Sequence, residues 1–136
     1  MTGGPHRRAG ALATALVVLS LGAGAGLAGC GDDGGDAIEF ETGGDPEAGR
    51  DAIRDLGCGT CHTVPGVRGA DALVGPPLTD WAQRSYIAGS LRNTPEELER
   101  WILDPQGIEP GTAMPDVGAT EEQAAHIAAY LFTLGD

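Results

Sequence analysis

The sequence is short of aromatic, basic and sulfur-containing residues, and each shortage limits the folds or functions that the chain can have. Only six of its 136 residues are Phe, Trp or Tyr, which is a thin supply for the core of a small domain. Its eight basic residues are outnumbered by 20 acidic ones, so the formal net charge is −12 and a nucleic-acid-binding function is excluded. Three cysteines and two methionines leave few candidates for sulfur chemistry.

The first 29 residues predict an export signal. Two arginines precede an uncharged apolar run, which ends in Leu27-Ala28-Gly29-Cys30. This sequence resembles the lipobox of bacterial lipoproteins, which predicts cleavage before Cys30 and attachment of lipid to it. The alternative is an uncleaved membrane anchor over residues 9–29, which the many glycines disfavour. Both interpretations place the rest of the chain at the outer face of the cytoplasmic membrane or in the periplasm.

Residues 31–44 predict a flexible tether, because they are mostly Gly, Asp and Glu and offer almost nothing to a core. With the lipidated Cys30 they form a segment over residues 30–44, and residues 45–136 form the single predicted domain. Removal of the signal peptide takes away two arginines and no acid, so the mature net charge falls from −12 to −14. This charge suits docking to a basic protein surface or, alternatively, serves only solubility.

Three helices are predicted in the domain, and each begins at an N-cap. Asp45 is followed by a proline at the first helical position, and Thr94 and Thr120 each start a capping box. The predicted helices cover residues 46–57, 95–103 and 121–134. A shorter helix over residues 77–84 is only weakly indicated. No segment alternates polar and apolar residues as a strand does, so the predicted fold class is all-α.

The sequence Cys58-Gly59-Thr60-Cys61-His62 predicts covalent attachment of one haem c. Thiols at this spacing can each add to one vinyl group of a haem, and the histidine that follows supplies an iron ligand. A thioredoxin-like redox pair would need a βαβ context that the sequence lacks, and half of a zinc site would need two further ligands. Because the core is thin, the haem would form part of it, and we expect the haem-free chain to be mostly unfolded.

Met114 is the candidate for the second iron ligand, because Met1 leaves with the signal peptide. It lies in the loop of residues 110–115, in which two prolines and a glycine restrict the backbone. His126 is the rival ligand, but it lies inside the predicted last helix and is expected on the surface. Ligation by methionine and histidine fills both axial positions of the iron, which favours electron transfer over substrate binding.

The imidazole of His62 needs a hydrogen-bond acceptor for its Nδ1–H, since such a partner fixes the ring of a metal-bound histidine. The sequence offers a backbone carbonyl at Gly75-Pro76. The same residues are equally consistent with a simple turn.

With both ligand motifs in this order, residues 45–136 resemble a class I mono-haem cytochrome c. The resemblance implies a small all-α fold with three main helices around one covalently bound haem. It also implies that Gly49 on the first helix lets Tyr130 on the last helix cross closely. Such proteins usually have an aromatic residue four positions after this glycine, where this chain has Ile53, which predicts a looser crossing.

The resemblance also implies roles for residues beyond the ligands. Gly75, Pro76 and Leu78 occupy the segment that receives the histidine Nδ1–H in such proteins. Arg84 falls where related cytochromes place an arginine beside a haem propionate, although an arginine there could also be an ordinary surface residue.

A narrower resemblance covers residues 86–106 and continues to Met114-Pro115. This stretch is similar to the cytochrome c domain of caa-type cytochrome oxidase subunit II, which passes electrons to the copper centre of the oxidase. It implies that Trp101 and Leu98 line the methionine side of the haem, with Asn93 and Trp81 nearer its edge. We expect a free-standing lipoprotein version, since the sequence has no membrane hairpin pair and no copper-binding cluster.

Together these features predict an electron carrier and not an enzyme. The expected partners are a quinol-oxidising complex as donor and a terminal oxidase or reductase as acceptor, with the chain a monomer or a subunit of a respiratory complex. A haem-based redox or gas sensor is the alternative, and it would need Met114 to leave the iron. A peroxidase-like enzyme would need a distal histidine or arginine beside an open iron position.

Overall fold

The structure of the chain is a computed structural model, and it describes residues 41–135. The predicted signal peptide, Cys30 and the predicted tether up to residue 40 lie outside the described residues. The described elements, in chain order, are α1 (Pro46–Asp55), β1 (Tyr86–Ile87), β2 (Leu91–Arg92), α2 (Pro95–Leu103), α3 (Pro105–Ile108) and α4 (Glu121–Phe132). Among residues 41–135, no helix combines the length and the apolarity needed to cross a membrane.

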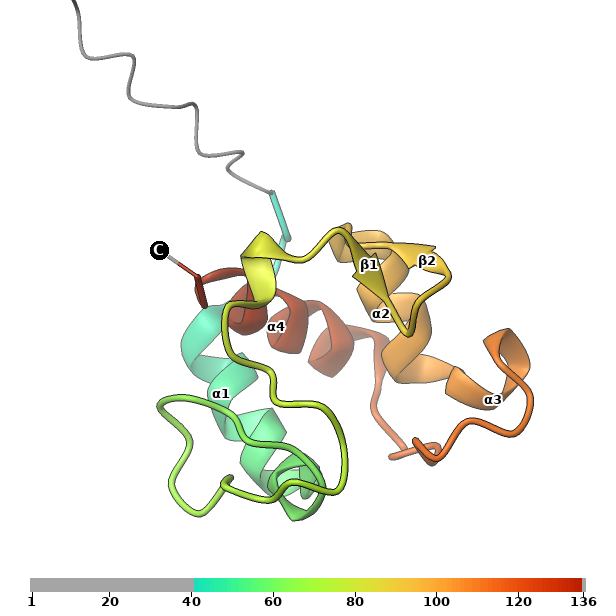
Figure 1. Cartoon of the computed structure of the whole chain (residues 1–136). Helices are drawn as coiled ribbons and strands as arrows, with labels where there is room; N and C mark the ends of the chain where they lie inside the picture. Colours follow the sequence, from blue (N-terminus) through green and yellow to red (C-terminus); the bar gives the residue numbers. More distant parts are fainter. Residues whose placement is uncertain (1–40, 136) are drawn as a thin grey trace, which may run out of the picture. The chain divides into compact units, whose positions relative to one another are not determined.

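Helix α4 is the centre of the fold, because both α1 and α2 pack against it (Figure 1). Each of the three helices contributes one apolar face to a common core. The large buried side chains that the three helices give to that core include Ile53, Leu98, Ile102, Ile127 and Leu131. The predicted all-α fold with three main helices is confirmed.

The crossing of α1 and α4 depends on a glycine. A Cβ atom on Gly49 would lie 1.9 Å from the carbonyl oxygen of His126 and 3.0 Å from the Cβ of Tyr130, so only glycine allows this approach. The hydroxyl of Tyr130 donates a hydrogen bond to the carbonyl of Pro65 at 2.6 Å, which ties α4 to the loop after the C-x-x-C-H motif. Ile53, at the position usual for an aromatic residue, is 1% exposed and fills the core.

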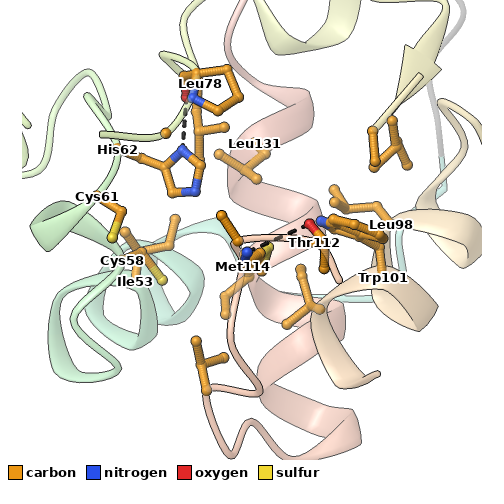
Figure 2. Close-up of a pocket in the computed structure, with 18 of the residues that line it drawn as sticks. Ile53, Cys58, Cys61, His62, Leu78, Leu98, Trp101, Thr112, Met114 and Leu131 are labelled. Atoms are coloured by element: carbon orange, nitrogen blue, oxygen red, sulfur yellow. Dashed lines mark hydrogen bonds between the residues drawn. The ribbon is translucent and has the colours of Figure 1, made fainter. Parts of the chain in front are cut away.

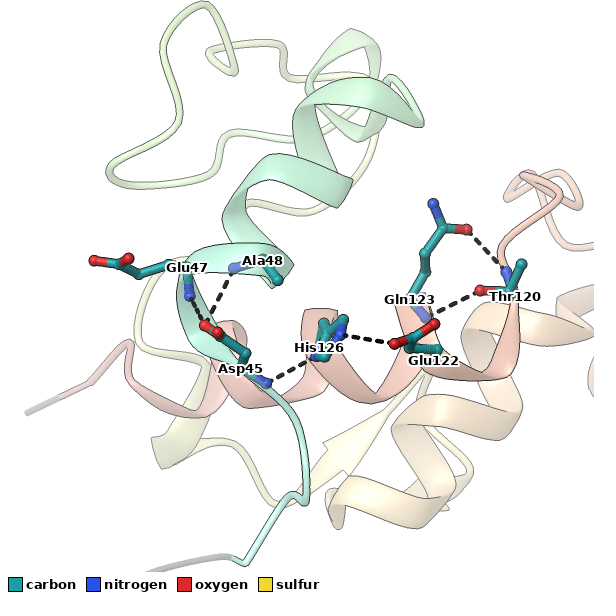
Figure 3. Close-up of polar contacts among 7 residues, drawn as sticks. All are labelled: Asp45, Glu47, Ala48, Thr120, Glu122, Gln123 and His126. Atoms are coloured by element: carbon teal, nitrogen blue, oxygen red, sulfur yellow. Dashed lines mark hydrogen bonds and ion pairs between the residues drawn. The ribbon is translucent and has the colours of Figure 1, made fainter.

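Two of the predicted N-caps have the expected hydrogen bonds (Figure 3). The Asp45 carboxylate accepts from the backbone N–H groups of Glu47 and Ala48. At α4 the capping box is complete, since the Thr120 hydroxyl accepts from Gln123 N–H and the Gln123 side chain accepts from Thr120 N–H. These caps satisfy backbone donors that have no partner inside a helix, and so they fix where α1 and α4 begin.

The capping box predicted for α2 forms only in part. Thr94 accepts from the backbone of Glu97 at 3.4 Å, but the Glu97 carboxylate turns away to pair with Arg100 at 2.7 Å. The predicted reciprocal bond is therefore wrong, because an arginine one turn later offers the carboxylate a charged partner. Helix α2 nevertheless covers the predicted residues, Pro95–Leu103.

Other departures from the predicted elements are local. The prediction of no strand is wrong, because β1 and β2 form a short antiparallel hairpin whose turn holds Ala88 and Gly89 at φ values of 49° and 81°. Residues 77–84 contain only a 3-10 turn, Trp81–Gln83, instead of a short helix. Helix α3 was not predicted, and α4 ends at Phe132, before the predicted end at Leu134.

Candidate functional site

A cavity of about 500 Å³ opens between the helices and three loops (Figure 2). Its inner wall consists of apolar side chains from α1, α2 and α4, among them Ile53, Leu98, Trp101, Ile127 and Leu131. Sequence reasoning named Trp101 and Leu98 for this role through the resemblance but did not assign Ile53, Ile127 or Leu131 to a binding site. Their helical spacing predicts burial, and nothing in it tells a cavity wall from an ordinary core.

The C-x-x-C-H motif forms one wall of the cavity. Gly57, with φ of +74°, turns the chain out of α1, and a 3-10 turn follows at Cys58–Thr60. The carbonyl of Cys58 accepts from the N–H groups of Cys61 and His62 at 3.2 and 3.0 Å. This turn places both thiols and the imidazole on the same cavity. Burial, aided by the neighbouring Cys61, raises the pKa of the Cys58 thiol.

The His62 ring is oriented by the carbonyl predicted from Gly75-Pro76. His62 Nδ1 lies 2.7 Å from the carbonyl oxygen of Pro76. A carbonyl can only accept, so Nδ1 must carry the hydrogen and Nε2 of the neutral ring keeps its lone pair. Nε2 lies on the side of the ring away from Pro76, and the ring lines the cavity (Figure 2). The ring is therefore prepared to bind a metal through Nε2.

Residues 75–78 hold the motif at several points. Gly75 N–H donates to the carbonyl of Cys61 at 2.7 Å, and Leu78 N–H donates to the carbonyl of Thr63 at 2.8 Å. A Cβ atom on Gly75 would lie 2.5 Å from Cε1 of His62, so glycine is needed for the segment to pass this close to the ring. Leu78 is half-buried and also lines the cavity.

Met114 reaches the same cavity from a different loop. It is half-buried, packs against the core and lines the cavity, and Figure 2 shows its side chain in the space that His62 and the two cysteines also border. The two predicted iron ligands and the two predicted attachment thiols are thus brought together, although they are spread over 57 positions of the sequence from residue 58 to residue 114.

Arg84 lies in the cavity wall, and its position is fixed. One guanidinium nitrogen donates to the carbonyls of Pro77 and Thr79, and the guanidinium stacks on the Trp81 ring at 5.0 Å from its centre. Asn93, expected near the haem edge, does not itself line the cavity but lies directly behind two residues that do. Its amide donates instead to the carbonyls of Trp81 and Arg84 and so holds the backbone of this turn.

His126, the rival ligand, is not part of the cavity wall. Its Nδ1 accepts a hydrogen bond from the backbone N–H of Asp45 at 2.8 Å, and Nε2 lies 3.8 Å from the Glu122 carboxylate (Figure 3). The ring therefore joins the start of α1 to α4 and is directed away from the predicted iron site.

The donor set fits a haem better than a bare metal ion. The described residues contain no group of three or more His, Cys, Asp or Glu side chains that could hold a metal ion by themselves. What they offer is a largely apolar cavity with two thiols, one imidazole and one thioether on its wall. Thiols can attach a porphyrin, imidazole and thioether can bind its iron, and the apolar wall can cover its faces.

Comparisons with known proteins agree with this reading of the site. The chain is similar to "Cytochrome c oxidase subunit 2" of Alkalihalophilus pseudofirmus, with 39% identity over 87 residues that make up 63% of this chain and 25% of that protein. It is also 36% identical over 88 residues to "Cytochrome c oxidase subunit 2" of Bacillus sp. strain PS3, covering 62% of this chain and 25% of that protein. The chain thus spans about a quarter of the length of these relatives.

The family model described as cytochrome c matches residues 46–135, which include the C-x-x-C-H motif, residues 75–78 and Met114. This range is nearly the whole of the described part of the chain. Since the match, the relatives and the donor set agree, the chain belongs to the cytochrome c family of electron-transfer proteins and carries one covalently bound haem c.

Proposed function

We propose that this protein is a membrane-tethered electron carrier that delivers electrons to a terminal oxidase or reductase. The observation that carries the proposal is that His62 and Met114, from separate loops, line one cavity together with both thiols. If the imidazole of His62 and the thioether of Met114 both held the iron of a bound haem, no iron position would be left for a substrate. The bound haem supplies one-electron redox chemistry, while the chain supplies attachment, ligands and burial.

The surroundings of the ligands support rapid electron transfer. The Pro76 carbonyl fixes the His62 ring, so the ligand has little freedom to reorient when the charge at the site changes. The apolar wall keeps water away from the site, and methionine–histidine ligation raises the reduction potential relative to two histidines. A carrier of this kind suits the oxidising end of a respiratory chain.

The rim of the cavity is suited to contact with a partner protein. Val74 and Tyr86 line the cavity and are also 80% and 59% exposed, so they lie where the cavity opens. Among the exposed residues of the cavity wall, Glu109 alone carries a charge. An apolar rim in a protein whose predicted mature form has a net charge of −14 favours an acceptor with an apolar contact area and basic surroundings. The similarity to oxidase subunit 2 supports an oxidase as that acceptor.

The tether is proposed from the sequence. Cys30 follows a basic start, an apolar run and small residues, which is the pattern of a lipoprotein signal. Lipid on Cys30 would keep the domain near membrane-embedded donors and acceptors. The expected donor is a quinol-oxidising complex at the outer face of the cytoplasmic membrane.

The test is expression of the full chain in a bacterium that matures both c-type cytochromes and lipoproteins. We expect a red protein in the membrane fraction, covalent haem, and a weak sulfur-to-iron absorption band in the oxidised state. The reduced protein should be reoxidised by membranes that contain a terminal oxidase. Cys30→Ala should release the protein from the membrane with an unchanged spectrum.

Three results would each contradict a part of the proposal. A colourless mature protein would exclude the haem. Tight binding of carbon monoxide to the reduced wild-type protein at neutral pH would indicate a readily vacated iron position, and so favour the sensor alternative. Retention of the Cys30→Ala variant in the membrane would contradict the lipid tether while leaving electron transfer intact.

A further inference from the structure

We propose that Gln106 is the positioning residue that holds Met114 against the cavity. This inference rests on the proposed role of Met114 as an iron ligand. It concerns a side chain on α3 that neither the motif spacing nor the resemblance singled out. The segment between α3 and the N-cap of α4, residues 109–119, is called the Met114 loop below.

The Gln106 amide makes several contacts with the Met114 loop. Its Nε2 donates to the carbonyl of Thr112 at 2.7 Å and to the carbonyl of Met114 itself at 2.9 Å. Its Oε1 lies 3.4 Å from the backbone N–H of Gly111, which donates to it. An amide nitrogen has two hydrogens, so both are used on this loop.

The remaining hydrogen bonds of the loop are local, beginning with that from Glu109 N–H to the carbonyl of Pro105 at 2.9 Å. Thr112 N–H donates to the carbonyl of Glu109 at 3.0 Å, Met114 N–H donates to the Thr112 hydroxyl at 3.5 Å, and Gly118 N–H donates to the Asp116 carboxylate. Within the described residues, Gln106 therefore provides the hydrogen bonds that join residues 111–114 to the helical body.

Gln106 can act as an anchor because its own backbone is fixed. Pro105, its neighbour, is among the most buried residues, below 2% exposure. The Asp104 carboxylate accepts from Gly107 N–H at 2.8 Å, and Asp104 N–H continues the hydrogen bonding of α2 by donating to Arg100. Helix α2 supplies part of the cavity wall, so Gln106 fixes the position of Met114 relative to that wall.

The consequence concerns how easily the thioether leaves the iron. A methionine thioether is a neutral ligand that competes with added ligands for its position. When the loop is held in place, the free energy needed to displace the thioether includes breaking or straining the Gln106 hydrogen bonds. Loss of two such bonds, each modest in net free energy, should favour displacement by roughly ten-fold.

The test compares three variants of the haem-loaded protein with the wild type. Gln106→Ala removes all the contacts, and Gln106→Glu keeps the acceptor oxygens but removes both donors. Gln83→Ala is the matched control, because Gln83 is also exposed and its Nε2 also donates to a backbone carbonyl, that of Gly135 at 2.8 Å. The measurement is the affinity of imidazole for the oxidised protein, and loss of the sulfur-to-iron band is the signal that reports binding.

We expect imidazole to bind roughly ten-fold more tightly to both Gln106 variants than to the wild type, and Gln83→Ala to bind it like the wild type. Carbon monoxide binding to the reduced variants should change in the same direction. Unchanged imidazole affinity in Gln106→Ala, or an equal increase in Gln83→Ala, would overturn the proposal. Absence of the sulfur-to-iron band in the wild type would instead contradict methionine ligation itself. As a control, the melting temperature of each variant is measured to show that it is folded.

Discussion

Replacing Gly75 by alanine should disturb the histidine side of the haem site. The added Cβ would lie 2.5 Å from Cε1 of His62 and 2.8 Å from its Nδ1. Ordinary contact begins at 3.4 Å, so the ring or the segment must move by about 0.9 Å. The Nδ1–H bond to Pro76, now 2.7 Å long, would be stretched or broken by a shift of that size.

The expected magnitude follows from this overlap. Forcing extra volume into a packed site costs about 1–3 kcal/mol. In a domain of this size each kcal/mol lowers the melting temperature by about 4–8 °C, so we expect a fall of roughly 5–20 °C. Loss of the Nδ1–H bond makes the imidazole less basic and a weaker partner for ferric iron, so the reduction potential should rise.

The assay is thermal unfolding of the haem-loaded Gly75→Ala variant together with potentiometric titration. Leu73→Ala is the control, since Leu73 is two residues away, 80% exposed and not part of the cavity wall. That variant should stay within about 0.5 kcal/mol of the wild type. A Gly75→Ala protein with the melting temperature and potential of the wild type would refute the reasoning about the close approach.

Three further predictions test other parts of the molecule. Alanine has a helix propensity about 1 kcal/mol better than glycine. Gly49→Ala should nevertheless lower the melting temperature, because the added Cβ would lie 1.9 Å from the His126 carbonyl oxygen. A melting temperature above that of the wild type would contradict the close crossing of α1 and α4. Burial, with a contribution from Glu96, raises the pKa of Glu99, so its charged form costs stability. In urea unfolding, Glu99→Gln should therefore be more stable than the wild type at about pH 7, and this advantage should shrink by about pH 4. A stability advantage that grows on acidification would contradict a raised pKa of Glu99. Met114→Ala should abolish the sulfur-to-iron band, lower the potential and let the reduced protein bind carbon monoxide, whereas an unchanged spectrum would reject the ligand.

The starts of the helices were predictable because capping is local. Asp45, Thr94 and Thr120 each accept from backbone groups two or three residues ahead, so the information lies in one short stretch. Other features depend on the rest of the fold. The strands β1 and β2 have two residues each, too few for an alternating pattern.

One pair of residues has two structural roles at the junction of α2 and α3. Asp104-Pro105 is a stop signal in the sequence, and α2 does end at Leu103. The pair also starts α3, in which Asp104 is the N-cap and Pro105 occupies the first helical position. A proline that cannot continue one helix is well suited to begin the next, so the sequence alone does not separate the two roles.

The residues of the site also differ in how far the sequence alone indicates them. The candidate reacting groups come from the sequence because their chemistry leaves few alternatives: one thiol pair, the adjoining His62, and Met114, which is the remaining methionine if the predicted signal peptide is removed. Gln106 could not be predicted, because a glutamine gains a role only when the fold brings two carbonyls within its reach. The two proposed ligands are held by separate contacts, Pro76 for the histidine and Gln106 for the methionine. Each side of the iron can therefore be perturbed without the other, which is what lets the Gly75 and Gln106 variants report on different ligands.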